Sequence, residues 1–213
     1  MSKVLFVKGT PQSEEQSRST QVARAFINEY QEVNPTDEII EVDVYYANVP
    51  LIDADFLTGQ KKLRSGEVLT DVEAQKIEAV NAFTKQFMEA DKYIIQSSMW
   101  NLGIQPLLKA YFDTIMSAGK TFKYTSEGPE GLMKGKKAIH IHGMGGFYSQ
   151  AIGMEHSDSY VRGALKFVGI EVEPPIFVEG IDYDPTKKEE VVAAAIEKAK
   201  AAARTFKKEL WWD

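Results

Sequence analysis

Hydroxyl and cationic side chains cluster directly after the first apolar run of the chain. Lys8-Gly9-Thr10 ends that run, and Ser17-Arg18-Ser19-Thr20 opens a stretch with helical periodicity. A helix N-terminus offers free backbone N–H groups and the positive end of the helix dipole, and together these bind phosphate. N-capping alone needs one hydroxyl, whereas four hydroxyls converge here with one guanidinium. This first loop therefore predicts a phosphate site.

Motifs that the first loop lacks narrow the kind of phosphate ligand. The loop has no Walker-type run of glycine and lysine, and no G-x-G-x-x-G follows the apolar run. The pattern favours a mononucleotide over ATP or over a dinucleotide bound in the Rossmann manner.

A second candidate loop places an aromatic residue among polar and small ones. It runs from Ser97 to Pro106 and contains Met99-Trp100-Asn101-Leu102, followed by Gly103. An aromatic side chain in such a loop packs against a flat ring, while loop N–H groups bond the heteroatoms of the ring. Taken alone, the segment is equally consistent with Met99 and Trp100 covering the core.

A third candidate loop is rich in glycine. Gly143-Met144-Gly145-Gly146 follows a buried apolar run. Glycine after a buried strand allows positive φ and a close approach of the backbone to a ligand. A tight turn without a ligand explains the same residues, so this loop gains meaning only beside the other two.

Short apolar runs and longer amphipathic stretches alternate along the chain and position these loops. The apolar runs are 4–7, 39–44, 93–96, 138–141 and 176–178, and the helical patterns are 19–33, 71–90, 106–118, 157–168 and 186–210. Consecutive apolar residues indicate strands that are covered on both faces. The alternation predicts an α/β fold, a doubly wound five-stranded parallel sheet with helices on both faces. In such folds the ligand lies beyond the carboxyl ends of the strands, where all three loops begin.

One connection is longer than its task requires. About 25 residues separate the second apolar run from the next helical pattern, where a few normally suffice. The segment 45–70 contains Tyr45, Tyr46, Pro50 and Phe56, and such aromatic loops are functional sites, interfaces or mere padding. We therefore expect one domain over residues 1–213 with a long insertion at about 45–70.

Composition excludes several classes of protein. The chain has 213 residues and no cysteine, which rules out disulfides, thiolate zinc sites, iron–sulfur clusters and a cysteine nucleophile. A formal charge of −6 argues against nucleic acid as a partner. No apolar stretch approaches the roughly 20 residues that a membrane span needs, and the chain opens without a signal-peptide pattern. We expect a cytoplasmic protein that is bound to neither membrane nor nucleic acid.

Two other constellations carry weaker signals. His140 and His142 lie two residues apart on an expected strand and so point to one face. A metal pair would need a third ligand, and none is evident nearby, so we predict no metal and assign the two histidines to packing or hydrogen bonding. No G-x-S-x-G elbow surrounds Ser17, Ser97 or Ser98, which argues against a serine hydrolase.

Together these segments resemble a known family, the FMN-dependent NADH-azoreductases, also described as NADH:quinone oxidoreductases, of the flavodoxin-like superfamily. The resemblance spans nearly the whole chain. Its blocks are MSKVLFVK at the start, SRS at 17–19, MWNLGIQPLLKAYFDTI at 99–115, GKTFKYTSEGPEGLMKGKKA at 119–138, GGFY at 145–148, and the later FVGI and EGIDY. No block is specific alone, but the combination is.

The resemblance implies a role for each candidate loop. Thr10, Ser17, Arg18 and Ser19 match the segment that holds the phosphate and ribityl chain of FMN. The segment Met99–Leu102 matches the residues alongside the isoalloxazine, and Gly143, Met144, Gly145 and Gly146 match the loop at its pyrimidine end. Tyr124 and Phe167 match aromatic residues of the acceptor pocket. Family members are homodimers in which the partner chain completes the pocket.

The resemblance also implies the reaction. Hydride would pass from NADH or NADPH to bound FMN and then to quinones or azo compounds by a ping-pong mechanism, with reductive cleavage of azo bonds and no assigned catalytic side chain. Two departures concern the pocket: the family often has Phe at the place of Leu102, and Arg or a polar residue at the place of Met144. Two alternatives stay open, a non-enzymatic FMN electron carrier of flavodoxin type and a non-flavin binding module on the same fold.

Overall fold

A parallel sheet forms the centre of the computed structural model, which describes residues 1–151 and 153–207. Its strands lie in the order β2-β1-β3-β6-β7, and β8 also pairs with β6. The strands are β1 (Lys3–Lys8), β2 (Glu38–Asp43), β3 (Lys92–Ser98), β6 (Lys137–Met144), β7 (Glu171–Val172) and β8 (Ile176–Glu179). All pairs in this sheet are parallel, so the predicted doubly wound α/β architecture is confirmed.

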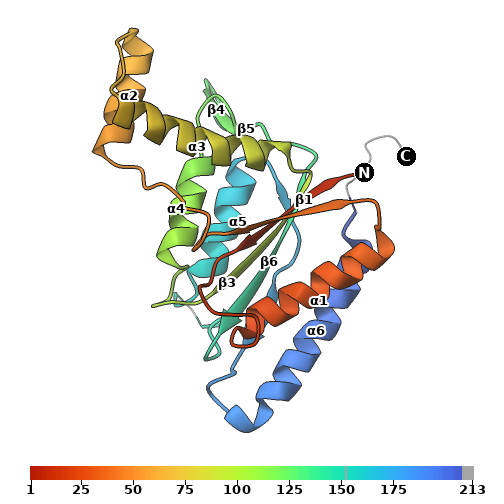
Figure 1. Ribbon diagram of the computed structural model, residues 1–213. Coiled ribbons are helices and arrows are strands. Elements are labelled where there is room, and N and C mark those ends of the chain that lie inside the picture. The colour runs from red at the N-terminus through yellow and green to blue at the C-terminus, as the bar shows by residue number, and fades with distance from the viewer. Residues whose placement is uncertain (152, 208–213) are drawn as a thin grey trace.

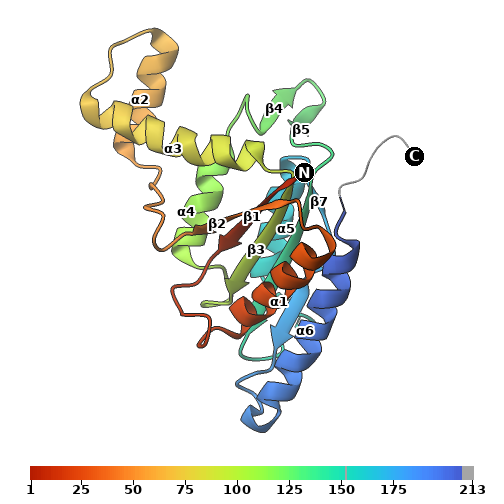
Figure 2. The same cartoon turned by 45° about the vertical axis from the view of Figure 1, so that its right-hand side comes forward.

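Helices cover both faces of the sheet (Figures 1 and 2). They are α1 (Arg18–Val33), α2 (Ala54–Ser65), α3 (Asp71–Glu89), α4 (Pro106–Ile115), α5 (Ser157–Phe167), the short 3-10 helix η1 (Pro185–Lys187) and α6 (Lys188–Thr205). Residues of α1 and α6 join one apolar cluster, and residues of α3, α4 and α5 join the other.

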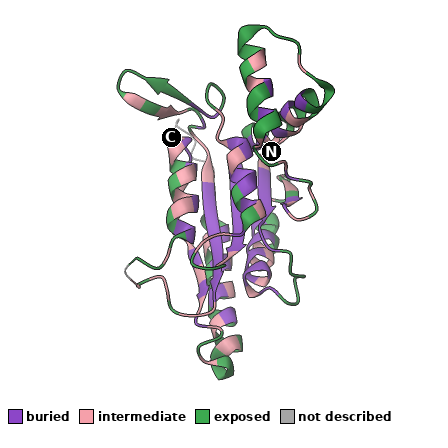
Figure 3. Ribbon diagram, turned by 90° about the vertical axis from the view of Figure 1, so that its left-hand side faces the viewer, coloured by how far each residue is buried: buried purple, intermediate pink, exposed green. Residues whose placement is uncertain are grey.

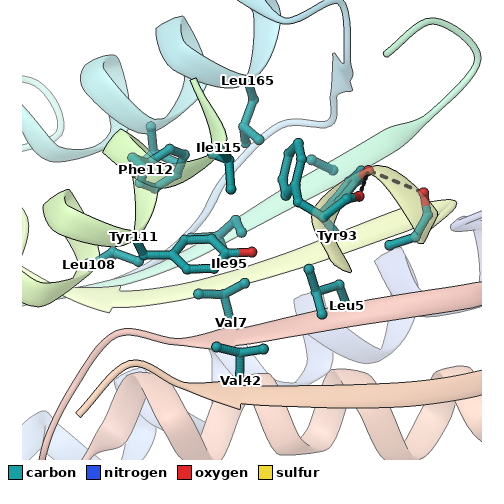
Figure 4. Packing of buried hydrophobic residues seen from close by; sticks show 14 of the residues in the cluster. Leu5, Val7, Val42, Tyr93, Ile95, Leu108, Tyr111, Phe112, Ile115 and Leu165 are labelled. Carbon is teal, nitrogen blue, oxygen red and sulfur yellow. Dashed lines mark hydrogen bonds between the residues drawn. The ribbon is translucent and has the colours of Figure 1, made fainter. Parts of the chain in front are cut away.

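Alternate residues of each strand feed the two cores, because successive side chains of a strand point to opposite faces. In β1, Val4 and Phe6 belong to the cluster under α1 and α6, whereas Leu5 and Val7 belong to the other. The central strands β1, β3 and β6 are buried along most of their length (Figure 3). The Tyr93 hydroxyl, inside the second cluster, donates to the carbonyls of Phe87 and Ala90 (Figure 4), so its burial leaves no polar atom unpaired.

The fifth strand differs from the prediction in one respect. It is split into β7 and β8, which pair with opposite ends of β6. The break contains Pro174 and Pro175, which have no backbone N–H to donate to a ladder and are confined to sheet edges and breaks. The sequence pattern identified only the part at 176–178, because β7 is two residues long.

The segment 45–70 is not a loop throughout, since α2 lies within it. Asp53 caps the N-terminus of α2 through the N–H of Phe56, and Gly66 ends the helix in the left-handed conformation at φ 74°. Phe56 is buried and packs with Ile77 and Val80 of α3, so its ring is not part of an exposed surface. Periodicity missed α2 because most of its side chains are polar or exposed.

The C-terminal helix is shorter than its predicted span of 186–210. Residues Pro185–Lys187 form η1, and α6 ends at Thr205. The last predicted residues, 208–210, lie outside the described part of the chain.

An antiparallel hairpin, β4 (Phe122–Thr125) with β5 (Gly128–Gly131), was not foreseen from the sequence. Its base contacts the end of α5, where Met133 N donates to Val168 O at 2.8 Å. A Cβ on Gly131 would lie 2.3 Å from Gly169 N and 2.3 Å from Val168 C. Only glycine permits this approach of two backbones.

We predict opposite effects on stability for two Gly→Ala substitutions. Gly131→Ala forces two backbone segments apart and should cost about 3 kcal/mol. Gly163→Ala, on the exposed side of α5 where an added Cβ meets nothing within 4 Å, should stabilise the protein by about 0.5–1 kcal/mol. Urea unfolding of both variants measures the difference, and equal effects would show that the close approach at Gly131 is not a constraint.

Candidate functional site

The loops after β1, β3 and β6 meet at the carboxyl edge of the sheet, at the bottom of Figures 1 and 2. They surround a cavity of about 290 Å³. Its lining residues are Gln12, Gln16, Arg18, Ser19, Ser98, Met99, Gly143, Met144, Gly145, Ile181, Asp182 and Lys188. All three candidate loops therefore contribute to one hollow, together with the segment that follows β8.

The first loop ends in a helix N-terminus with several hydroxyls. Ser17 is the N-cap of α1, and its hydroxyl accepts from Thr20 N at 3.3 Å and from the Thr20 hydroxyl at 2.8 Å. Ser19, two residues after the N-cap, lines the cavity. Its hydroxyl lies 3.1 Å from that of Ser98. The first turn of a helix leaves N–H groups without helical partners, so this wall offers donors to an anion.

A buried glutamine, Gln96, joins the first loop to the second. Its Nε2 donates to the Ser19 hydroxyl at 2.8 Å, and its Oε1 accepts from Gly9 N at 3.1 Å. The side chain is fully buried at the end of β3. Sequence reasoning did not single out Gln96, because its position inside an apolar run reads as part of a strand.

Arg18 supplies the cation closest to the helix N-terminus. Its Nε is buried and has no hydrogen-bond partner among the described residues, while Nη1 donates to Gln21 at 3.2 Å and Nη2 lies 3.4 Å from the exposed carboxylate of Glu189. Lys188 and Asp182 add one charge of each sign to the lining. A buried guanidinium N–H without a partner is the feature that an anionic ligand would satisfy.

The second loop is tied to the third and turns sharply. Met99 N donates to Gly143 O at 2.8 Å, and the backbones of Trp100 and Gly103 bond each other at 2.8 and 3.0 Å. The two residues of the turn, Asn101 and Leu102, have φ of 50° and 69°. Asparagine tolerates this region but leucine seldom adopts it, and such strain is typical of functional loops.

Trp100 is the more exposed of the two side chains that could cover the core. Its side chain is 42% exposed and lies 6.4 Å from Tyr45 between ring centroids. Met99 is half-buried and lines the cavity. The aromatic face of this loop is thus open to a flat partner.

The third loop brings backbone against the helix N-terminus. A Cβ on Gly143 would lie 3.1 Å from both the Cβ and the Oγ of Ser19, so a larger residue would crowd the cavity floor. Met144 is buried and lines the cavity. Gly145 O and Gly146 O accept from Asp182 N and Gly180 N at 2.9 and 3.2 Å, which fixes the loop to the segment after β8.

The predicted cofactor-site residues fall into two groups. Those that line the cavity are Arg18, Ser19, Met99, Gly143, Met144 and Gly145, and those that adjoin it in the same loops are Thr10, Ser17, Trp100, Asn101, Leu102 and Gly146. Thr10 is buried, and its carbonyl accepts from Lys8 Nζ at 3.0 Å. The sequence did not identify Gln12, Gln16, Ser98, Ile181, Asp182 or Lys188, although EGIDY after the last strand pointed to the same edge.

The predicted acceptor-pocket residues, Tyr124 and Phe167, lie elsewhere in the chain. Both contact Phe122, with ring centroids 5.4 and 4.8 Å away. They lie near the start of β6, whereas the cavity lies at its end, and a strand of this length spans about 23 Å. Figures 1 and 2 show the hairpin at the top and the cavity loops at the bottom. Within one chain these two rings therefore do not reach the cavity.

A larger hollow, of about 650 Å³, is at neither place. It lies between the end of β2 and α3 and is lined by Tyr46, Asn48 and Phe83 among others. None of the predicted site residues borders it, and its walls offer no cluster of cations or hydroxyls. Size alone does not make it the site, and the smaller polar cavity has the chemistry.

The histidine pair is explained by hydrogen bonding, as predicted. His140 Nε2 and His142 Nδ1 lie 2.8 and 2.7 Å from the hydroxyl of Ser97. Over residues 1–151 and 153–207, no group of three or more His, Cys, Asp or Glu side chains is arranged to hold a metal ion. Nor, within the same ranges, is any helix both long and apolar enough to cross a bilayer.

Comparison with known proteins decides the family. A family model described as "Flavodoxin-like fold" matches residues 2–203. A curated relative from Listeria innocua, FMN-dependent NADH:quinone oxidoreductase 2, is 51% identical over 211 residues, which cover 97% of this chain and 100% of the relative. The chain belongs to this flavodoxin-like oxidoreductase family. The resemblance drawn from the sequence and the prediction of an oxidoreductase enzyme are confirmed.

Other relatives and solved structures agree. FMN-dependent NADH:quinone oxidoreductase of Staphylococcus haemolyticus is 43% identical over 208 residues, 97% of this chain and 100% of that protein. The crystal structure of an azoreductase from Bacillus anthracis superposes with a TM-score of 0.90 at 37% identity, covering 97% and 100% of the two chains. A second, an FMN-dependent NADH-azoreductase from Bacillus anthracis in complex with FMN, gives 0.89 at 31% identity, with 96% and 99% covered.

Proposed function

We propose that the cavity at the carboxyl edge holds FMN and that the protein transfers hydride from NADH or NADPH to quinones, azo compounds or both. The observation that carries the proposal is the convergence of three loops on one cavity lined by Arg18, whose Nε is buried and has no hydrogen-bond partner in the described part of the chain. Relatives and a neighbouring structure whose names include FMN support it.

The donor set suits a flavin mononucleotide. Arg18 and the hydroxyls of Ser17 and Ser19 at the N-terminus of α1 would hold the phosphate, with Thr10 supporting the ribityl segment. Met99 to Leu102 would lie alongside the isoalloxazine, and Gly143 to Gly146 at its pyrimidine end. The cavity has a volume of about 290 Å³, just below the range of about 300–1,000 Å³ that is usual for ligand pockets. It therefore has room for part of the cofactor and would leave the ring accessible.

The protein contributes orientation more than chemistry. When bound, FMN supplies the hydride-accepting and hydride-donating chemistry. The exposed Trp100 and the strained Asn101–Leu102 turn would align flat reactants face to face, which is the main contribution to rate that we assign to this chain. No side chain of the lining is assigned as a general acid. An azo bond would need two such cycles for complete cleavage.

Tyr124 and Phe167 can serve the acceptor pocket only from a second copy of the chain, because they lie at the opposite edge of the sheet from the cavity. We therefore propose a homodimer in which each pocket takes these rings from the partner. Exposed apolar side chains of the segment 45–70 support a contact surface there. They are Tyr46, Leu51, Ile52, Leu57, Leu63 and Val68.

A non-enzymatic FMN electron carrier of flavodoxin type is the second candidate. Steady-state oxidation of NADH with a quinone distinguishes the two, because an electron carrier that does not react with the nicotinamide gives no turnover in this assay. The cytoplasmic location and the absence of nucleic-acid and membrane partners stay predictions from the sequence.

The phosphate assignment predicts the effect of removing two hydroxyls. Ser17→Ala/Ser19→Ala should weaken FMN binding, because each hydrogen bond to a charged group contributes about 1.5–3 kcal/mol. Fluorescence titration of the apoprotein with FMN measures the change. The control is Thr70→Ala, which removes the N-cap of α3 and costs about 1 kcal/mol of stability without touching the cavity. Unchanged affinity in the double variant would refute the assignment.

A shared pocket predicts the kinetic pattern. If donor and acceptor occupy the same face in turn, initial rates against NADH at several fixed quinone concentrations should give parallel double-reciprocal lines. Intersecting lines would indicate a ternary complex and two separate sites, contrary to the proposal.

The dimer proposal links assembly to the cofactor. A ligand held by both chains stabilises the dimer by mass action, so FMN should suppress dissociation on dilution in sedimentation experiments. Leu57→Glu, at an exposed position of α2, should weaken the dimer, whereas Val33→Glu, at an exposed position of α1, should not. A stable monomer with full FMN affinity and activity would show that each pocket is complete within one chain.

A further inference from the structure

Four buried polar side chains form a continuous hydrogen-bonded chain between β3, β6 and α5. His140 Nδ1 lies 2.9 Å from Asp158 Oδ1, and His140 Nε2 lies 2.8 Å from the Ser97 hydroxyl. The same hydroxyl lies 2.7 Å from His142 Nδ1. Strand register explains the arrangement, because Ser97 pairs directly with His142 and Ile95 with His140. The three side chains therefore point to the same face of the sheet.

The order Asp158, His140, Ser97 is that of a hydrolase triad, but these three side chains cannot act as one. Ser97 and His140 are fully buried and Asp158 nearly so, which leaves no path for a substrate to the hydroxyl. The serine is also bonded to a second imidazole, that of His142. The group must act inside the protein.

Asp158 sets the direction of the hydrogen bonds. Burial alone would raise the pKa of its carboxyl, but the hydrogen bond and charge of His140 and the nearby Arg162, at 3.3 Å, hold that pKa below the ordinary 3.8. An ionised carboxylate only accepts. His140 Nδ1 must therefore carry a proton, and only its Nε2 changes state.

Two arrangements of protons satisfy every hydrogen bond of this network. When His140 is neutral, its Nε2 accepts from Ser97, the Ser97 oxygen accepts from Nδ1–H of His142, and His142 Nε2 is bare. When His140 is an imidazolium, its Nε2–H donates to Ser97, Ser97 donates to His142 Nδ1, and His142 Nε2 carries the hydrogen. His142 is neutral in both arrangements but changes tautomer.

The environment keeps the charge on one ring only. Burial, and then the positive charge of His140, lower the pKa of His142 well below 6.5, against the opposing effects of Asp158 and Ser97. The ring of Phe177 on β8 lies 6.4 Å away. On the same face, α4 contributes the phenol of Tyr111, whose pKa is raised by burial. A positive charge is therefore stable only beside Asp158.

The open end of the chain lies next to the cavity. His142 Nε2 is buried and has no hydrogen-bond partner among the described residues. Met144, two residues further along β6 and therefore on the same face of the sheet, lines the cavity. At the other end, the network stops at Asp158 and Arg162. Both carboxylate oxygens of Asp158 are engaged, by His140 and by Arg162, so His142 Nε2 is the end of the network that can take up a proton without breaking a hydrogen bond.

We propose that Asp158, His140, Ser97 and His142 form a proton relay that takes up and releases one proton at His142 Nε2. A proton that binds there lets His142 Nδ1 pass its own proton to the Ser97 oxygen, and Ser97 passes its proton to His140 Nε2. Each atom gives up one N–H or O–H bond as it gains another, and no electron moves. The charge ends on His140 beside the Asp158 carboxylate, and release reverses every step.

The relay would supply protons to the reaction, and this use rests on the proposed function. Hydride addition to a quinone leaves an oxyanion that must take up a proton. Storage of one proton behind the cavity wall would serve that need. The relay can be tested in the protein without FMN, because all four of its side chains belong to the protein itself.

Nuclear magnetic resonance of the histidine ring nitrogens in the FMN-free chain tests the relay directly. The chain has three histidines, and the exposed His156 is an internal reference. Spectra recorded from about pH 9 down to about pH 5 should show His142 neutral throughout, with its hydrogen moving from Nδ1 to Nε2 in step with proton uptake at His140 Nε2. In Ser97→Ala the tautomer change of His142 should no longer follow His140. Thr114→Val, which removes a buried hydroxyl of α4 outside the network, should leave the coupling intact.

Three results would overturn the proposal. One is that His142 keeps a single tautomer while His140 titrates, another is that neither ring changes, and the third is that coupling persists in Ser97→Ala. The unsubstituted chain alone decides the first two even if a variant fails to fold. If the unsubstituted protein showed the tautomer change of His142 but did not reduce quinones with FMN and NADH, the proposed function would be wrong and the relay would stand.

Discussion

The site depends on one buried amide, that of Gln96. A polar side chain at zero exposure in the middle of a sheet is costly unless all its atoms are bonded, and here Oε1 takes the N–H of Gly9 while Nε2 reaches Ser19. These two bonds fix the turn after β1 and the first turn of α1 relative to β3. Since Ser19 in turn lies against Ser98 and Gly143, the three loops share one anchored frame.

The polar interior follows the carboxyl edge of the sheet. Near this edge β3 and β6 carry Gln96, Ser97 and His142, each hydrogen-bonded to a neighbouring strand or helix, whereas Ile94, Ile95 and Ile139 lie earlier in the same strands. Buried polar networks of this kind hold their members in one geometry when every atom is satisfied. Among the buried polar atoms that have no hydrogen-bond partner in the described residues, Arg18 Nε and His142 Nε2 belong to residues in or directly next to the cavity wall. We assign the first to a ligand and the second to a proton.

The sequence predicted the parallel sheet and the three loops because both rest on local signals: apolar runs, cap residues and glycines. It failed where packing decides. Phe56 is buried although its neighbours are exposed, since α2 folds back on α3 through Asp53 and Gly66. The split of the last strand follows from Pro174 and Pro175, and β7 is too short to leave a pattern. Gln96 and Asp182 need the tertiary fold to meet the cavity. Tyr124 and Phe167 lie away from the cavity within one chain, because a resemblance in sequence does not give distances in the fold.

The central claim is that these three loops form one FMN site. The most direct measurement is the visible absorption spectrum of the protein after incubation with FMN and gel filtration. The account predicts a flavin band that elutes with the protein at one FMN per chain, with maxima displaced from those of free FMN because the ring lies against the Met99–Leu102 loop. A colourless protein fraction, with all flavin eluting as the free compound, would contradict it.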